Sequence, residues 1–313
     1  EYSAQEPLLR QQLLDLQREL RELGRFPVMV VFAGVDGAGK TQTINLLNQW
    51  MDPRWLVTRA YDEPSEEERE RPEYWRFWRD LPPKGRIGLF LSSWYSRPVL
   101  NRVYSQIDDA EFMKRLDRIV AFENALADDG ALILKFWMHL SRDAQKRRLK
   151  LLEKDPLSSW RVTESHWKHW GMYDQFVEAE ERTIMRTSTG KAPWILVEGE
   201  DENFRSLEVG QTLARYLREH LIANGVKLNG ENETLQASQP ETDSLPPRPE
   251  GLVTVLSQLD TSKRLGKTDY KKKMRKYQGE LHLLQRKAMK KGVSSIIVFE
   301  GMDAAGKGGA IRR

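Results

Sequence analysis

The chain has 313 residues, of which 39% are hydrophobic and 31% charged, a balance that indicates a soluble globular protein and excludes a disordered one. The formal charge is +4, no apolar run reaches the roughly 18 residues needed to span a bilayer, and the absence of Cys excludes disulfides, thiolate zinc sites and thiol nucleophiles. The first residues contain no apolar signal core, so we expect a cytoplasmic protein without membrane contact. The length allows about two domains of roughly 150 residues.

Apolar runs alternate with charged helical stretches along the first part of the chain. A helix is expected over 8–24, where leucines recur at helical spacing and Gly24 follows them. Strands are expected over 28–34, 85–91, 131–137 and 192–199. Further helices are expected over 41–51, 66–79, 109–128, 141–154, 173–187 and 203–222. This alternation predicts one α/β domain over 1–222 with a parallel sheet and crossover helices.

A polar, Pro-rich and Asn-rich stretch over 223–250 predicts a linker, after which the first pattern returns. Residues 277–307 repeat 16–40 as helix, short turn, apolar strand, glycine loop and Lys. The repeat stops in the helix after its loop, and so short a piece cannot bury a core of its own. We therefore expect 251–313 to be the N-terminal fragment of a second domain in a longer protein, with docking of this fragment on the first domain as the alternative.

The small net charge of the whole chain is the sum of an acidic first part and a strongly basic later segment. Residues 263–291 contain twelve Lys or Arg and two acidic residues, whereas residues 1–262 contain 35 basic and 42 acidic residues. The basic stretch predicts contact with a polyanion or an acidic surface, and the alternative is a solvated Lys-rich helix. Nucleic acid is not expected as a partner, because only Tyr270 and Tyr277 interleave the basic residues.

The most specific motif is G-V-D-G-A-G-K-T at 34–41, a Walker A pattern between a predicted strand and a predicted helix. Glycines let the backbone N–H groups surround a phosphate, and the helix N-terminus adds its dipole. Lys40 would supply a point charge and Thr41 could hold Mg²⁺. The phosphate-binding residues predicted in this loop are Gly34, Gly37, Ala38, Gly39 and Thr41.

A second loop, G-M-D-A-A-G-K-G at 301–308, lacks the final Ser or Thr, so Mg²⁺ there would need another ligand. Asp303 is the candidate, and Asp36 occupies the same place in the first loop. An acid beside bound phosphates is costly unless it faces a cation or takes a proton. Both aspartates are therefore predicted to bind Mg²⁺ or to activate the acceptor. The phosphate-binding residues predicted in this loop are Gly301, Ala305, Gly306 and Gly308.

Several motifs together resemble the family-2 polyphosphate kinases over residues 10–222 and 275–313. They are the two loops, S-W-Y-S-R (93–97), K-F-W (135–137), D-P-L-S-S-W (155–160) and A-P-W (192–194). The tandem arrangement is similar to the polyphosphate:AMP phosphotransferases of that family. The resemblance implies a P-loop kinase-like three-layer sandwich with a helical lid. It also implies Mg²⁺-dependent transfer of a terminal phosphoryl group from inorganic polyphosphate to AMP, giving ADP, by a protein that we expect to be a homo-oligomer.

The resemblance also assigns roles to residues of the two loops. In the second copy, Asp303 would bind Mg²⁺ or activate the acceptor while Lys307 holds the phosphates, and Asp36 and Lys40 are the equivalent catalytic candidates of the first copy. Family members continue with a glycine pair and then a basic pair that reaches along the polyphosphate. In the second copy these residues are Gly308, Gly309, Arg312 and Arg313.

The first copy departs from the family pattern at two places. After the loop, Thr41 and Gln42 stand in place of the glycine pair, and Asn45 and Leu46 stand in place of the basic pair. The strand ending F-L-S-S-W-Y-S-R has Leu91 and Ser92 in place of the family's Asp and Arg. Arg97 persists and is predicted to contact phosphate. Because leucine cannot bind Mg²⁺ and phosphoryl transfer depends on charge neutralisation, the first domain is expected to be weakly active or inactive.

Each of three further segments has both a functional and a purely structural interpretation. The basic residues of 141–150 lie where the family has a cover over the active site, and the alternative is a solvated helix face. H-W-K-H-W (166–170) has two His at a metal-binding spacing, but packing is favoured because no third ligand is evident. W-R-F-W (75–78) could stack a base, and packing is again favoured.

Two other functions stay open at this point. A conventional ATP-dependent nucleotide or nucleoside kinase would share the loop and a basic lid, although the loop Asp and S-W-Y-S-R favour polyphosphate. Alternatively, the first domain is a non-catalytic scaffold that binds polyphosphate, as Leu91 and Ser92 suggest.

Overall fold

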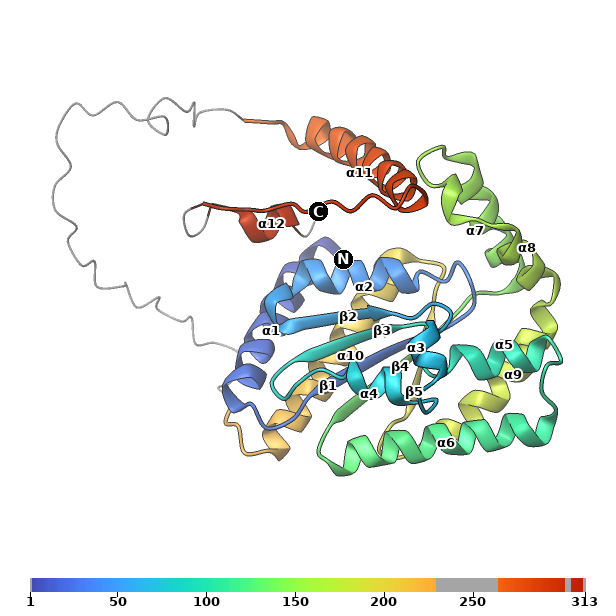
Figure 1. Ribbon diagram of the computed structural model, residues 1–313. Helices are drawn as coiled ribbons and strands as arrows, with labels where there is room; N and C mark the ends of the chain where they lie inside the picture. Colours follow the sequence, from blue (N-terminus) through green and yellow to red (C-terminus); the bar gives the residue numbers. More distant parts are fainter. Residues whose placement is uncertain (1, 229–263, 302–304, 312–313) are drawn as a thin grey trace, which may run out of the picture. The chain divides into compact units, whose positions relative to one another are not determined.

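The computed structural model describes residues 2–228, 264–301 and 305–311 (Figure 1). Within its first part, five parallel strands form one sheet in the order β2-β3-β1-β4-β5. The strands are β1 (Val28–Gly34), β2 (Leu56–Ala60), β3 (Ile87–Leu91), β4 (Leu132–His139) and β5 (Trp194–Glu198). Since β1 is the central strand, the loop that follows it opens at the middle of the carboxyl edge, where parallel sheets bind ligands.

Helices cover both faces of this sheet and make a three-layer α/β fold (Figure 1). One layer holds α1 (Tyr2–Leu23), α2 (Lys40–Trp50) and α10 (Glu202–Ala223), which contact one another. The other layer holds α5 (Ser96–Val103), α6 (Asp109–Asp128) and α9 (Tyr173–Thr187), which also contact one another. Inward-facing Met29 and Val31 of β1 belong to the core beneath α6, and their burial follows from the apolar run that predicted the strand.

Further elements complete the first part of the chain. They are α3 (Glu66–Arg69), α4 (Trp75–Arg79), α7 (Arg142–Lys154), α8 (Glu164–Gly171) and the 3₁₀ turns η1 (Pro53–Trp55) and η2 (Ser159–Arg161). We call α7 to α8, residues 142–171, the lid, after the cover that the family resemblance predicts at residues 141–150. The expected helix over 66–79 is wrong as one element, since the chain leaves α3 before Pro72, which lacks an N–H for a continuing helix, and starts α4 afterwards.

The α/β class, the parallel sheet and four of the five strands were predicted correctly. Strand β2 was missed because it lies at the edge of the sheet, where Leu56 is its one buried residue and the rest of L-V-T-R-A is half-buried or exposed. No apolar run marks such a strand in the sequence.

Residues 228–297 separate from the first part as a unit of their own, described here from residue 264 onward. This unit contains α11 (Lys267–Lys290), and α12 (Lys307–Ile311) follows the second glycine loop. The strand expected after α11 is not formed: residues 293–300 pair with no strand in the described ranges and are exposed. A strand needs a neighbour for its main-chain hydrogen bonds. Residues 229–250 of the predicted linker and the predicted start of the second domain at 251–263 lie outside the described residues. Within the ranges given above, no helix has the length and apolar character to cross a membrane.

Candidate active site

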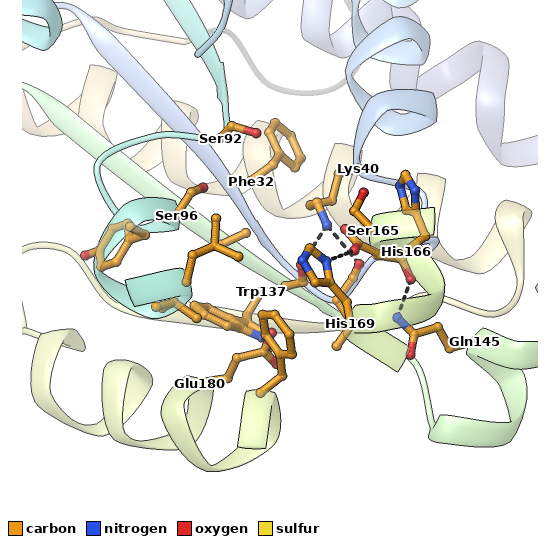
Figure 2. Close-up of a pocket in the computed structure, with 18 of the residues that line it drawn as sticks. Phe32, Lys40, Ser92, Ser96, Trp137, Gln145, Ser165, His166, His169 and Glu180 are labelled. Atoms are coloured by element: carbon orange, nitrogen blue, oxygen red, sulfur yellow. Dashed lines mark hydrogen bonds and ion pairs between the residues drawn. The ribbon is translucent and has the colours of Figure 1, made fainter. Parts of the chain in front are cut away.

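A cavity of about 520 Å³ lies at the carboxyl edge of the sheet, where β1, β3 and β4 end (Figure 2). Its apolar wall includes Phe32, Tyr95, Val99, Leu100, Trp137 and Phe176. Its polar groups include Asp36, Lys40, Asp62, Ser92, Gln145, His166, His169 and Glu180. A cavity of this size, with an apolar wall and a few convergent polar groups, suits a ligand as large as a nucleotide.

The loop of residues 34–41 has the backbone that its glycines predict. Gly34, Gly37 and Gly39 have φ values of 111°, 82° and 92°, which side chains rarely adopt. A Cβ on Gly34 would lie 2.0 Å from the main-chain oxygen of Met138, so β4 also requires glycine here. Lys40 begins α2, and its Nζ donates to the main-chain oxygens of residues 34 and 35 at 2.6 and 2.8 Å. The lysine therefore rests across the loop, at the cavity.

The structure places some of the predicted catalytic and phosphate-binding residues at the cavity and others away from it. Gly34, Asp36 and Lys40 line it, and Ala38 is fully buried beneath the loop. Thr41 is exposed on the first turn of α2 and does not line the cavity. Arg97 is likewise exposed, on the first turn of α5. Their phosphate contacts stay predictions.

Replacing Gly39 by Ala is expected to lower the free energy of unfolding by about 2–4 kcal/mol. The new Cβ would stand 2.4 Å from Cζ of Arg205, a buried guanidinium that donates to Gly199 O at 2.6 Å and to Thr43 Oγ1 at 3.2 Å. Gly130→Ala is the matched control, because its φ is also 92° but nothing lies within 4 Å of the new Cβ. Urea unfolding followed by circular dichroism measures both variants. Equal losses would show that Arg205 does not restrict this position.

Asp36 is joined to the lid by a short hydrogen bond. His169 Nδ1 lies 2.6 Å from Asp36 Oδ2, and His169 Nε2 lies 2.8 Å from the hydroxyl of Tyr104, the residue that follows α5. Burial favours the neutral acid, but the His169 hydrogen bond and the charge of Lys40 outweigh burial and hold the pKa of Asp36 at about 2. Asp36 is therefore an anion at neutral pH.

Glu180 is a second acid in the cavity, on α9 near Trp137 (Figure 2). Trp137 Nε1 donates to its Oε2 at 3.4 Å. Burial raises the pKa of Glu180 to about 7, although the charge of Lys40 opposes the rise. The cavity thus holds one carboxylate that is ionised and one carboxyl that takes up a proton near neutral pH.

Glu180→Gln is expected to gain stability over the wild type as the pH rises from about 5 to about 8, by about 1–3 kcal/mol. The folded wild type keeps a proton on Glu180 up to about pH 7, whereas the unfolded chain releases it near pH 4.5. Between these values the folded state binds more protons, so a rising pH favours unfolding of the wild type. Urea unfolding of both proteins at the two pH values measures the difference. A difference that does not change with pH would contradict the raised pKa.

The lid contacts the loop through one of its basic residues. Arg148 Nη2 donates to Gln42 Oε1 at 2.8 Å, and Arg148 Cγ lies 3.5 Å from where a Cβ on Gly37 would be. Lys146 instead lies over the ring of Trp170, and Arg147 pairs with Glu200 at 2.7 Å. Of these three, Arg148 is the cation that lies against the loop.

Two of the motifs that carry the family resemblance, S-W-Y-S-R and K-F-W, contribute to a buried polar network behind the cavity. Lys135 Nζ donates to Glu123 Oε2 at 2.7 Å, to the Tyr95 hydroxyl at 2.9 Å and to Thr187 O at 2.8 Å. Trp94 Nε1 and the Tyr95 hydroxyl both donate to Glu123 Oε1, at 3.0 and 2.7 Å. Since the Tyr95 ring lines the cavity, the network fixes the wall that faces the loop.

The second loop repeats the local geometry of the first wherever it is described. Lys307 Nζ donates to the main-chain oxygen of Gly301, six residues earlier, as Lys40 does to Gly34. Gly306 has a φ of 84°, and α12 begins at Lys307. The glycine and alanine positions predicted to bind phosphate here, Ala305, Gly308 and Gly309, are exposed. Asp303, Arg312 and Arg313 lie outside the described residues.

Magnesium fits the first loop only in company with phosphate. Mg²⁺ prefers oxygen ligands and often takes one or two carboxylates, with phosphates and water completing its shell. Asp36 provides one such carboxylate, and its Oδ2 is hydrogen-bonded to His169. Across the described ranges no three acidic or His side chains converge as a complete metal site.

The sequence did not identify four residues of this site as functional. Tyr104, Gln145 and Glu180 were not singled out, and His169 was interpreted as a packing residue. One signal existed for Glu180, because it stands four residues after Phe176 and four before Ile184 on a predicted helix, on the apolar face, which is an unusual place for an acid. No pattern in the sequence points to the contact between His169 and a loop far from it in the chain.

Comparison with known proteins places the chain among close relatives. The family described as Polyphosphate kinase 2 (PPK2) matches residues 1–224 and 264–313. The polyphosphate:AMP phosphotransferases of Pseudomonas aeruginosa and Pseudomonas syringae pv. tomato are 45% and 41% identical over 97% and 100% of this chain. The chain spans 60% and 61% of the lengths of those two relatives. The crystal structure of polyphosphate kinase 2 from Arthrobacter aurescens TC1 superposes with a TM-score of 0.67 at 27% identity, over 70% of this chain and 78% of that one.

Proposed function

The chain belongs to the polyphosphate kinase 2 family, and on that premise we propose that it takes part in transferring the terminal phosphoryl group of inorganic polyphosphate to AMP. The observation that carries the proposal is the loop of residues 34–41, whose Lys40 lies across a cavity of nucleotide size beside the ionised Asp36. The names of the two Pseudomonas relatives support the choice of substrates.

The proposed reaction needs no covalent enzyme intermediate. An oxygen of the AMP phosphate attacks the terminal phosphorus of polyphosphate, the bond to the next phosphate breaks, and the products are ADP and a chain one phosphate shorter. The attacking and leaving oxygens lie in line, and most of the catalysis is positioning and charge stabilisation. Loop amides and the loop lysine would stabilise the oxygens of the transferred group.

Magnesium is proposed as the cofactor, since Mg²⁺ would neutralise charge on the phosphates during transfer. Asp36 would contribute a ligand in the first loop and Asp303 in the second. AMP, ADP and polyphosphate are the proposed partners, and a cytoplasmic homo-oligomer with a tandem pair of domains stays a prediction of the same proposal.

The first copy is proposed to be weakly active or inactive on its own. At the end of β3, Leu91 pairs in register with Phe32 and does not line the cavity, so this strand end brings no acid to the phosphates. Ser92 follows with a φ of 51° and reaches the cavity with a hydroxyl only. These two residues favour a second candidate function for this domain, a scaffold that binds polyphosphate and supports the other copy.

The proposal is tested by following ADP when the full-length natural protein is mixed with AMP, Mg²⁺ and either polyphosphate or ATP. We expect polyphosphate to be the effective donor, because the proposed chemistry uses a chain of phosphates without a second adenosine. A protein that makes ADP from ATP alone would be a conventional nucleotide kinase, and the proposed donor would be wrong.

A further inference from the structure

Helix α8 reaches the phosphate-binding loop through His169. The two nitrogens of this ring contact two different segments, the loop through Asp36 at 2.6 Å and the end of α5 through Tyr104, which caps it, at 2.8 Å. Figure 2 shows His169 and Lys40 approaching the same part of the cavity. The ring thus ties together three segments that are far apart in the sequence.

Asp36 is held by the lid at a second point. Gln145 of α7 is buried, and its Nε2 donates to the main-chain oxygen of Asp36 at 3.0 Å. The two helices of the lid therefore fix the main chain and the side chain of one loop residue. The other carboxylate oxygen, Oδ1 of Asp36, has no hydrogen-bond partner among the described residues, and Asp36 lines the cavity.

We propose that His169 is a positioning residue of the first loop, which holds Oδ2 of Asp36 so that Oδ1 is available to a Mg²⁺ ion carried by the phosphate chain. The inference rests on the proposed function, because it takes phosphates with Mg²⁺ as the ligand of this cavity. Nδ1 donates its proton to the carboxylate, and the Tyr104 hydroxyl donates to Nε2, which fixes the tautomer and the ring.

One consequence is that the lid and the ligand depend on each other. If α8 must be in place for Asp36 to hold the ion, a bound phosphate chain with Mg²⁺ must stabilise α8 by the same factor. A side chain that only packed the lid would change the stability of α8 without changing the response of phosphate binding to Mg²⁺.

The test measures polyphosphate binding by isothermal titration, with Mg²⁺ and with EDTA, in the full-length natural protein carrying Lys307→Ala to weaken the second loop. His169→Ala is expected to lower affinity about 10–100-fold in Mg²⁺ and to change it little in EDTA. His169→Asn, which keeps an N–H donor at the place of Nδ1, should recover most of the loss, and Tyr104→Phe should lie between them. Thr163→Ala is the control, since Thr163 caps α8 but does not contact Asp36.

The outcomes separate this inference from the proposed function. If the protein with an intact His169 binds polyphosphate and His169→Ala keeps the same response to Mg²⁺, His169 is a packing residue and the inference is wrong. If His169→Ala binds more tightly in Mg²⁺, the ring competes with the ion, and the inference is again wrong. If the protein with an intact His169 does not bind polyphosphate under either condition, both the inference and polyphosphate binding at this loop are refuted.

Discussion

Lys307→Ala in the full-length natural protein is expected to reduce AMP phosphorylation by about 100–1000-fold, whereas Lys40→Ala is expected to leave most of it. Both lysines rest in the same way, each donating to the main-chain oxygen six residues earlier, so the lysine itself does not distinguish the copies. The difference is expected from the surrounding groups, since β3 of the first copy ends at Leu91 and is followed by Ser92, neither of which is an acid. The turnover rate with saturating polyphosphate and AMP measures the effect.

Each lysine variant has a control that keeps the charge, and the pair of variants has a result that would contradict the assignment. Because both lysines begin helices near a loop, Lys→Arg at each position tests whether charge alone restores activity. Full activity in Lys307→Ala together with lost activity in Lys40→Ala would assign catalysis to the first loop. In that case the substitution of Leu91 for an acid would not limit the first copy.

Glu123→Ala is expected to lower the free energy of unfolding by about 3–5 kcal/mol, because it leaves a buried cation without its counterion. Lys135 is fully buried and would keep only the Tyr95 hydroxyl and the main-chain oxygen of Thr187 as acceptors near its charge. Trp94 and Tyr95 would lose their shared acceptor as well. Urea unfolding at neutral pH measures the loss.

Two comparisons show whether burial causes this loss. Glu123→Leu combined with Lys135→Met removes both charges, and we expect it to cost less than Glu123→Ala alone. Lys191→Ala removes one partner of an exposed ion pair with Asp128 and should cost less than about 1 kcal/mol. If Glu123→Ala cost no more than Lys191→Ala, the network would not fix the cavity wall.

The sequence predicted those parts of the fold that depend on local patterns. Four strands are apolar runs bounded by Gly or Pro, and Gly34, Gly37 and Gly39 predicted the loop conformation because few other residues adopt such φ values. Strand β2 has no such pattern, since it lies at the edge of the sheet and buries one residue. The expected strand after α11 shows the converse, an apolar run that has no neighbour to pair with in the described ranges.

The site could be predicted only where its residues belong to a short motif. Asp36 and Lys40 lie in the loop and line the cavity as expected. His169 and Glu180 line it from α8 and α9, and Tyr104, which follows α5, contacts His169, so these positions depend on the tertiary fold. Lys135 is another such case, because its place within an apolar strand predicts burial but says nothing about Glu123, which comes from α6.

The central claim, that polyphosphate is the phosphoryl donor to AMP, is tested most directly with both donors in one reaction. The full-length natural protein is given AMP, Mg²⁺, unlabelled polyphosphate and ATP labelled on its terminal phosphate, and the label in newly formed ADP is counted. Our account predicts that the new ADP is unlabelled and equals in amount the phosphate lost from the polyphosphate chain. Labelled ADP with unshortened polyphosphate would contradict it.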